Sequence, residues 1–181
     1  MGQDALLDTV RGLLTVVAAR EAGARRIILA GAPGDEERLA LDRALGADDI
    51  LDVGAGDPLA RLWTLNRGRL ATRVIEATGN AQAVELGLDL LTPGGVITIA
   101  GGHQPESRVA LKIGALVGQQ FDIRGTQLGA NQYEACLAVL AAGQYPFARL
   151  VTYHFALGDI HEAMRTFERR GACIKPVITF D

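Results

Sequence analysis

The sequence predicts an α/β protein with a doubly wound, mostly parallel β-sheet of the Rossmann type. Short runs of β-branched and aliphatic residues alternate with longer segments of helical periodicity, and glycines lie at the boundaries between them. The short runs are apolar almost throughout, which is typical of strands buried on both faces. With 181 residues, of which 49% are hydrophobic and 22% charged, the chain is long enough to bury one core without disulfides.

The first predicted element is an amphipathic helix over residues 4–22, which Gly23 closes. A doubly wound sheet ordinarily begins with a central strand and a glycine turn before its first helix. In this chain that first strand and its glycine turn are missing or degraded. We therefore expect an unpaired edge or a gap inside the sheet, with residues 4–9 filling it imperfectly.

Five apolar runs are predicted strands, and four segments among them are predicted helices. The strands cover residues 26–30, 49–53, 73–77, 96–100 and 121–124. The helices cover residues 35–45, 58–65, 81–91 and 131–142. Asp57 and Asn80 are the predicted N-caps of the second and third of these helices, and Pro93, Gly94 and Gly95 are expected to stop the third.

Composition argues against several classes of function. The 18 basic and 21 acidic residues give a net charge of −3 without a cationic run, so we expect no nucleic-acid partner. No apolar stretch approaches the ~20 residues that cross a bilayer, and the first residues do not resemble a signal peptide, so we expect no membrane partner. Cys136 and Cys173 are too few for a disulfide framework or a structural zinc site. These features predict a cytoplasmic protein.

Two glycine loops and one carboxylate are candidates for chemistry. The loops at residues 31–35 (GAPGD) and 54–56 (GAG) lack the further residues of complete phosphate-binding motifs, so each is a phosphate loop or a connecting turn. Glu76 lies in a predicted buried strand and must be paired or neutral, as a catalytic group or as an acceptor that anchors a loop. His103, His154 and His161 are far apart in the sequence and are interpreted as surface or packing residues.

Several short sequences, in their order, resemble the medium-chain dehydrogenase/reductase family, which includes zinc-dependent alcohol and polyol (sorbitol-like) dehydrogenases. Residues 74–79 (VIEATG) and 88–101 (LDLLTPGGVITIAG) carry the resemblance most clearly. Further sequences extend it at residues 38–40, 45–48, 123–125, 138–143, 155–164 and 174–178. The resemblance implies a cofactor-binding domain over residues 1–149 and a tail, residues 150–181, that packs toward the family's catalytic domain.

The resemblance also implies what this chain lacks. In the family, the zinc ligands, the proton relay and most of the substrate pocket belong to an N-terminal catalytic domain, which we expect to be absent here. The family's glycine turn falls at Leu7, Thr9 and Gly12, so only the third glycine is present. The chain resembles a family member that is truncated or altered in its first strand. We expect no turnover from it alone.

Cofactor-binding positions follow from the resemblance residue by residue. Gly31 stands where family members that prefer NAD often hold an acidic residue, and Arg38 could reach a 2′-phosphate, which favours NADP slightly over NAD. The alternative is that residues 32–33 lengthen the loop and bring Asp35 or Glu36 into the acidic role. Thr78 and Gly79 match backbone positions on the adenosine side. Ala100, Gly101 and Leu128 match main-chain positions that hold the nicotinamide carboxamide. Lys175 matches a basic position near the pyrophosphate. Arg38 and Lys175 are otherwise solvated surface residues.

Three interpretations remain open. The first is the cofactor-binding part of an NAD(P)-dependent alcohol or polyol oxidoreductase. The resemblance implies that the intact enzyme transfers a hydride with the help of zinc. It also implies a homodimer formed through the edge strand, here near Phe121 and Gly125. The second is a non-catalytic assembly fragment that no longer binds a dinucleotide. The third is a different α/β nucleotide-using protein, such as a methyltransferase, against which the ordered family-like sequences and the absence of an acidic residue at Gly31 argue.

Overall fold

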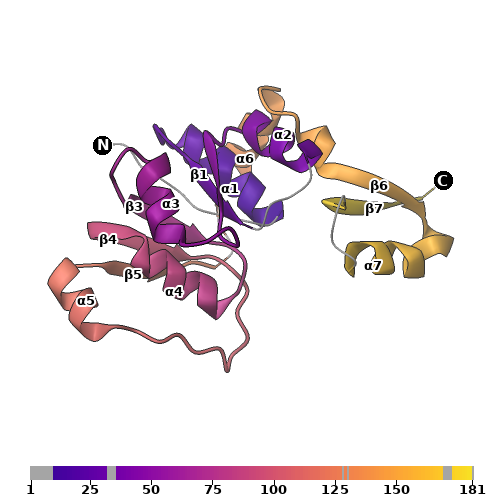
Figure 1. Cartoon of the computed structure of the whole chain (residues 1–181). Coiled ribbons are helices and arrows are strands. Elements are labelled where there is room, and N and C mark those ends of the chain that lie inside the picture. Colours follow the sequence, from indigo (N-terminus) through magenta and orange to yellow (C-terminus); the bar gives the residue numbers. More distant parts are fainter. Residues whose placement is uncertain (1–9, 32–35, 128, 130, 169–172, 181) are drawn as a thin grey trace.

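The structure has the α/β architecture that the sequence predicts. The computed structural model describes residues 10–31, 36–127, 129, 131–168 and 173–180, without the side chains of residues 10 and 36–38. The described strands form parallel sheets of order β1–β2, β3–β4–β5 and β6–β7 (Figure 1). No helix in these ranges is long and apolar enough to span a membrane.

Helices and strands alternate along the chain. The first elements are α1 (Val10–Glu21), β1 (Ile28–Gly31), α2 (Glu36–Ala44), β2 (Asp49–Asp52), α3 (Pro58–Leu65) and β3 (Ala71–Glu76). They are followed by α4 (Ala81–Asp89), β4 (Leu91–Ile99), α5 (Ile113–Gln119), β5 (Asp122–Gly125) and α6 (Tyr133–Ala141). The C-terminal part contains β6 (Val151–Ala156), α7 (Ile160–Glu168) and β7 (Lys175–Thr179), with short 3-10 turns η1 (Phe147–Leu150) and η2 (Leu157–Asp159) beside β6.

The core lies on both faces of the central strands. Leu29 of β1 belongs to a buried cluster with residues of α1 and α2, whereas its neighbour Ile28 belongs to a second cluster with residues of α3 and α4. Successive side chains of a strand point to opposite faces of its sheet. The two clusters therefore show that helices cover both faces, which is the doubly wound arrangement predicted from the apolar strands.

The two predicted N-caps are confirmed. The Oδ1 atom of Asp57 accepts a hydrogen bond of 3.0 Å from the N–H of Leu59 at the start of α3. Likewise, the Oδ1 atom of Asn80 accepts a hydrogen bond of 2.8 Å from the N–H of Gln82 at the start of α4. Each cap satisfies a backbone donor that has no partner inside its own helix.

The predicted end of the third helix is wrong. α4 ends at Asp89, and the Pro93–Gly95 segment that was expected to stop it lies inside β4. The register between β3 and β4 shifts in this region, and Gly94 has a φ of 73°. A strand with a shifted register and a left-handed glycine is interrupted locally without ending.

Within the described residues, β1 pairs only with β2, and β3 pairs only with β4. As far as the described residues show, the sheet is thus interrupted at the place where a doubly wound sheet has its first strand. Residues 4–9, which we expect to fill this place, lie outside the described residues. Gly12 is buried in the first turn of α1.

The C-terminal lobe, residues 151–168 and 173–180, contains β6, β7 and α7 and projects from the side of the molecule (Figure 1). β6 and β7 pair in parallel, and they meet the main body where Leu150 and Ile174 enter the first core cluster. The secondary structure of this lobe was not predicted from the sequence.

Candidate functional site

The site lies where β3 and β4 end. In their parallel register Glu76 pairs with Ile99, so the last residues of the two strands lie side by side. The segments that follow are the β3 loop (residues 77–80) and the β4 loop (residues 100–103). The N–H groups of Ala100 and Gly101 donate to the backbone carbonyl of Glu76 at 2.7 and 3.0 Å, which ties the start of the β4 loop to the end of β3.

The carboxylate of Glu76 accepts hydrogen bonds from both loops. Its Oε1 atom accepts from the N–H and Oγ1–H groups of Thr78, at 2.5 and 2.6 Å, and from the N–H of Gly79 at 2.7 Å. Its Oε2 atom lies 3.0 Å from Nε2 of His103. Because Glu76 is only 4% exposed, all of these bonds are formed away from bulk water.

Burial and hydrogen bonding act on Glu76 in opposite directions. Burial raises the pKa of the carboxyl group, whereas the hydrogen bonds from Thr78, His103 and Gly79 lower it, and their sum holds the pKa of Glu76 below its ordinary value. Glu76 is therefore an ionised, fully paired carboxylate that anchors loops, one of the two roles expected from the sequence.

Two glycines allow the loops to approach each other closely. Gly79 has a φ of 78°, and a Cβ atom placed on it would lie 2.5 Å from the carbonyl oxygen of Gly102. A Cβ atom on Gly101 would lie 2.7 Å from Oε2 of Glu76 and 2.7 Å from Cα of Gly79. No side chain larger than hydrogen fits at these positions without moving the backbone.

The structure brings four of the predicted site residues together: Thr78, Gly79, Ala100 and Gly101 all belong to the two loops. The first turn of α1 also reaches this place, because Nη1 of Arg11, the residue before Gly12, donates to the carbonyl oxygen of Ala100 at 3.3 Å.

The other predicted positions lie elsewhere or outside the description. Gly31 ends β1 and pairs with Asp52 at the end of β2. Arg38 lies in α2, but its side chain is outside the described residues, as is the whole of Leu128. Lys175 is exposed at the start of β7, where it pairs with Val151 of the C-terminal lobe. The structure does not bring Lys175 to the two loops.

His103 is the residue of this site that sequence reasoning missed. It is 27 positions from Glu76, and its spacing from other ligand-forming residues gave no sign of the pair. The signal that could have found it is the strand register: two adjacent parallel strands end at the same edge, so residues that follow each strand are candidates for contact.

The described residues contain no group of three or more His, Cys, Asp or Glu side chains placed to hold a metal ion. The donor groups present in this part of the chain do not fit a zinc site. We therefore derive no metal-assisted step for it.

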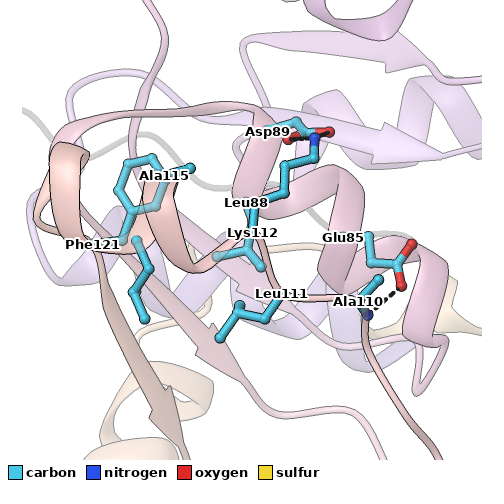
Figure 2. Close-up of a pocket in the computed structure, with 9 residues that line it drawn as sticks. Glu85, Leu88, Asp89, Ala110, Leu111, Lys112, Ala115 and Phe121 are labelled. Atoms are coloured by element: carbon cyan, nitrogen blue, oxygen red, sulfur yellow. Dashed lines mark hydrogen bonds and ion pairs between the residues drawn. The ribbon is translucent and has the colours of Figure 1, made fainter.

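A separate cavity of about 190 Å³ lies between α4 and the segment that contains α5 (Figure 2). Its lining is mostly apolar, with Leu88, Leu111 and Phe121 among its walls. Two polar contacts connect its two walls. Nζ of Lys112 lies 2.7 Å from Oδ1 of Asp89, and the N–H of Ala110 donates to Oε1 of Glu85 at 2.7 Å. Phe121 and Asp89 precede β5 and β4, so the cavity adjoins the amino ends of strands and not the site.

Comparison with known proteins identifies the family. Residues 12–142 match the family model described as zinc-binding dehydrogenase. A probable alcohol dehydrogenase of Mycobacterium tuberculosis is 35% identical over 152 residues, which cover 78% of this chain and 39% of the relative. An L-idonate 5-dehydrogenase of Vitis vinifera is 31% identical over 174 residues, covering 91% of this chain and 45% of the relative.

Solved structures share the fold. Benzyl alcohol dehydrogenase from Acinetobacter calcoaceticus superposes with a TM-score of 0.86 at 24% identity, covering 99% of this chain and 50% of that protein. An alcohol dehydrogenase from E. coli CFT073 complexed with NADH gives 0.84 at 22% identity, with coverages of 99% and 52%. A zinc-binding dehydrogenase from Sinorhizobium meliloti bound to NADP gives 0.81 at 24% identity, with coverages of 90% and 48%.

The chain therefore spans about half the length, or less, of these proteins. The matches favour the dehydrogenase interpretation over the non-catalytic fragment, and they make the methyltransferase interpretation wrong. The family match agrees with the described fold and with the position of the two loops at the ends of parallel strands. The chain belongs to the zinc-binding dehydrogenase family of alcohol and polyol dehydrogenases and corresponds to its cofactor-binding domain.

Proposed function

We propose that this chain binds a nicotinamide dinucleotide at the carboxyl ends of its parallel strands, as the cofactor-binding part of an alcohol or polyol oxidoreductase. The observation that carries the proposal is the convergence of the β3 and β4 loops at Glu76, since ligands of open α/β sheets bind in the crevice outside the carboxyl ends of the strands. When bound, a nicotinamide ring supplies hydride-transfer chemistry. The chain's own residues position that ring.

The residues assigned by family resemblance keep their roles as part of this proposal. The adenosine side of the cofactor contacts the backbone of Thr78 and Gly79. The nicotinamide carboxamide contacts the backbone of Ala100, Gly101 and Leu128. The polar groups of Thr78 and Gly79 that face Glu76 are already used, so their remaining backbone and side-chain surface would contact the cofactor. Gly12 allows α1 to pack closely, and Arg38 supplies positive charge to a phosphate group. Lys175 keeps its assignment to the pyrophosphate from the family resemblance, although the structure places it in the C-terminal lobe and not at the two loops.

The slight preference for NADP rests on Gly31. This residue ends β1 without a carboxylate, so nothing at that position repels a 2′-phosphate. Its partner on the next strand, Asp52, already accepts a hydrogen bond of 2.8 Å from the N–H of Gly54 through Oδ1. The Arg38 side chain would then bind the phosphate.

We place the zinc ligands of the intact enzyme, and the substrate alcohol or polyol, in a catalytic domain outside these 181 residues. The C-terminal lobe supports this placement, because it exposes large apolar side chains that an isolated domain would bury. Met164 and Phe167 of α7 are 54% and 55% exposed, and Phe180 is 78% exposed. The lobe would pack these residues against the catalytic domain.

We further propose a homodimer through β5. This strand pairs only with β4 among the described residues, and all four of its residues are exposed, with Ile123 at 39%. The neighbouring helix α5 exposes Ile113 and Val117 at 60% and 72%. An unpaired strand edge beside apolar side chains favours pairing with a second copy across a two-fold axis.

Calorimetric titration of the 181-residue chain with NAD⁺, NADP⁺ and S-adenosylmethionine tests the proposed function. We expect one binding site per chain for at least one of the two nicotinamide dinucleotides, tighter for NADP⁺, and none for S-adenosylmethionine. Heats equal to those of dilution for both dinucleotides would overturn the proposal.

A further inference from the structure

We propose that Glu76 is a positioning residue of the dinucleotide site, whose two carboxylate oxygens hold the β3 and β4 loops at the spacing that the cofactor requires. The inference rests on the proposed function, because it concerns the loops at which we place the cofactor. It assigns a role to Glu76 and His103 that goes beyond the backbone contacts of the proposed site.

The inference depends on the fact that each carboxylate oxygen of Glu76 bonds to a different loop. Every donor to Oε1 belongs to the β3 loop, namely the N–H and Oγ1–H of Thr78 and the N–H of Gly79, at 2.5 to 2.7 Å. The partner of Oε2 is His103 of the β4 loop at 3.0 Å. A single side chain, 4% exposed, is thus bonded to both loops. A shift of either loop breaks a hydrogen bond to a buried charge.

The chemistry of the group follows from its partners. Oε1 accepts three hydrogen bonds and Oε2 faces an imidazole, so both oxygens must act as acceptors when His103 donates. An ionised carboxylate offers only acceptors, whereas a protonated carboxyl group would place a donor against other donors. The lowered pKa of Glu76 agrees with this geometry.

Few other charges act on the pair. From α1, Arg11 donates a hydrogen bond of 3.3 Å to the carbonyl oxygen of Ala100, the first residue of the β4 loop. Farther along the same segment Glu106 is exposed and forms no ion pair among the described residues. From β3 itself, the titratable group that faces His103 is Glu76. The imidazole–carboxylate contact is therefore the charge interaction that holds the two loops together.

Replacing the carboxylate by an amide gives a distinctive dependence on pH. In Glu76→Gln the amide oxygen can take the place of Oε1, and the amide NH₂ group can donate to Nε2 of a neutral His103. A protonated imidazole has no free lone pair, so this contact fails when His103 gains a proton. In the wild type, by contrast, Nε2–H donates to the carboxylate in either protonation state.

The test is calorimetric titration of the full chain with NAD⁺ and NADP⁺ at pH 8 and pH 5.5. We compare the wild type, Glu76→Gln, the double variant Glu76→Gln with His103→Gln, and Glu106→Gln as a control that removes the same charge from an exposed position. The 2′-phosphate of NADP⁺ titrates in this range, but it does so equally for every variant. Circular dichroism at both pH values verifies that each variant is folded.

We expect Glu76→Gln to lose more dinucleotide affinity than the wild type when the pH is lowered from 8 to 5.5, by up to about tenfold, the factor that corresponds to one lost hydrogen bond with a buried donor left unpaired. The double variant should return to the wild-type profile, because the amide that His103→Gln introduces can accept a hydrogen bond from the other amide and does not titrate. Glu106→Gln should also follow the wild type. A purely structural Glu76 would lower affinity equally at both pH values.

Two different results would overturn the inference, and they are distinguishable. If the folded wild type binds neither dinucleotide, the proposed function is wrong and the role of Glu76 falls with it. If the wild type binds a dinucleotide but Glu76→Gln has the wild-type pH profile, or the double variant does not restore that profile, the proposed function stands and the positioning role is wrong.

Discussion

Substitution of Gly101 by alanine probes the close approach of the two loops. The added Cβ atom would overlap the backbone nitrogen of Gly79 and would lie 2.7 Å from both Oε2 of Glu76 and Cα of Gly79, whereas an ordinary van der Waals contact is 3.4 Å or more. The backbone must therefore move by well over about half an ångström, which strains a packed region or breaks the bond between Glu76 and His103. Such overpacking costs about 1–3 kcal/mol.

For a chain of this length we expect a fall in the unfolding midpoint of about 3–10 °C in thermal denaturation followed by circular dichroism. The next residue supplies a matched control, because a Cβ atom on Gly102 meets no atom within 4 Å. Gly102→Ala should change the free energy of unfolding by no more than about 0.5 kcal/mol. Gly101→Ala should also weaken dinucleotide binding. Equal midpoints for the two variants would refute the assignment of Gly101 to a sterically closed position.

Two further perturbations test the site and the dimer. Because the folded pKa of Glu76 lies below its ordinary value of 4.5, its ionisation contributes stability that is fully present above pH 4.5 and is lost as the pH falls through the folded pKa. We therefore expect the free energy of unfolding of the wild type, measured in urea between pH 3 and 6, to fall on acidification. The fall should be smaller in Glu76→Gln. An unchanged pH slope in that variant would contradict the ionised, hydrogen-bonded carboxylate. Ile123→Lys places a charge on the exposed edge strand β5 and should convert a wild-type dimer to a monomer in sedimentation velocity; a wild type that is already monomeric at micromolar concentration would contradict the dimer.

Much of the fold could be predicted because local signals and tertiary environment agree. The β-branched runs around Ile28, Val74 and Ile97 are strands since they fill the space between two helix layers, and the structure buries them accordingly. Asp57 and Asn80 have short polar side chains at the residue before a helical segment, and that local chemistry is sufficient to cap a helix.

The errors occur where tertiary contacts override local preference. Proline and glycine at residues 93–95 ordinarily stop a helix, but here Leu91 and Val96 on either side of them pair with β3, so they form the irregular part of a strand whose register shifts. The C-terminal lobe was not predicted as strand and helix, because polar residues interrupt β6 and β7 and neither strand contains a fully buried residue, so they lack the continuous apolar run that identified the central strands.

The candidate site was predictable in part for the same reason. Glycine and threonine after a buried strand, as at Thr78 and Gly79, identify a loop with special backbone requirements. The contact between Glu76 and His103, however, depends on the order and register of two strands, and no local pattern specifies either. Resemblance to a family supplied positions such as Ala100, whereas side-chain contacts such as that of Arg11 with its carbonyl required the structure.

The most direct measurement of the central claim is the mapping of backbone amide chemical shifts during titration with NAD⁺ or NADP⁺. We predict that the largest changes occur at Gly79, Ala100 and Gly101, with small changes at Ala110 and Leu111 beside the separate cavity. Largest changes at the cavity, or no changes at the two loops under saturating dinucleotide, would contradict the claim that the cofactor binds where β3 and β4 end.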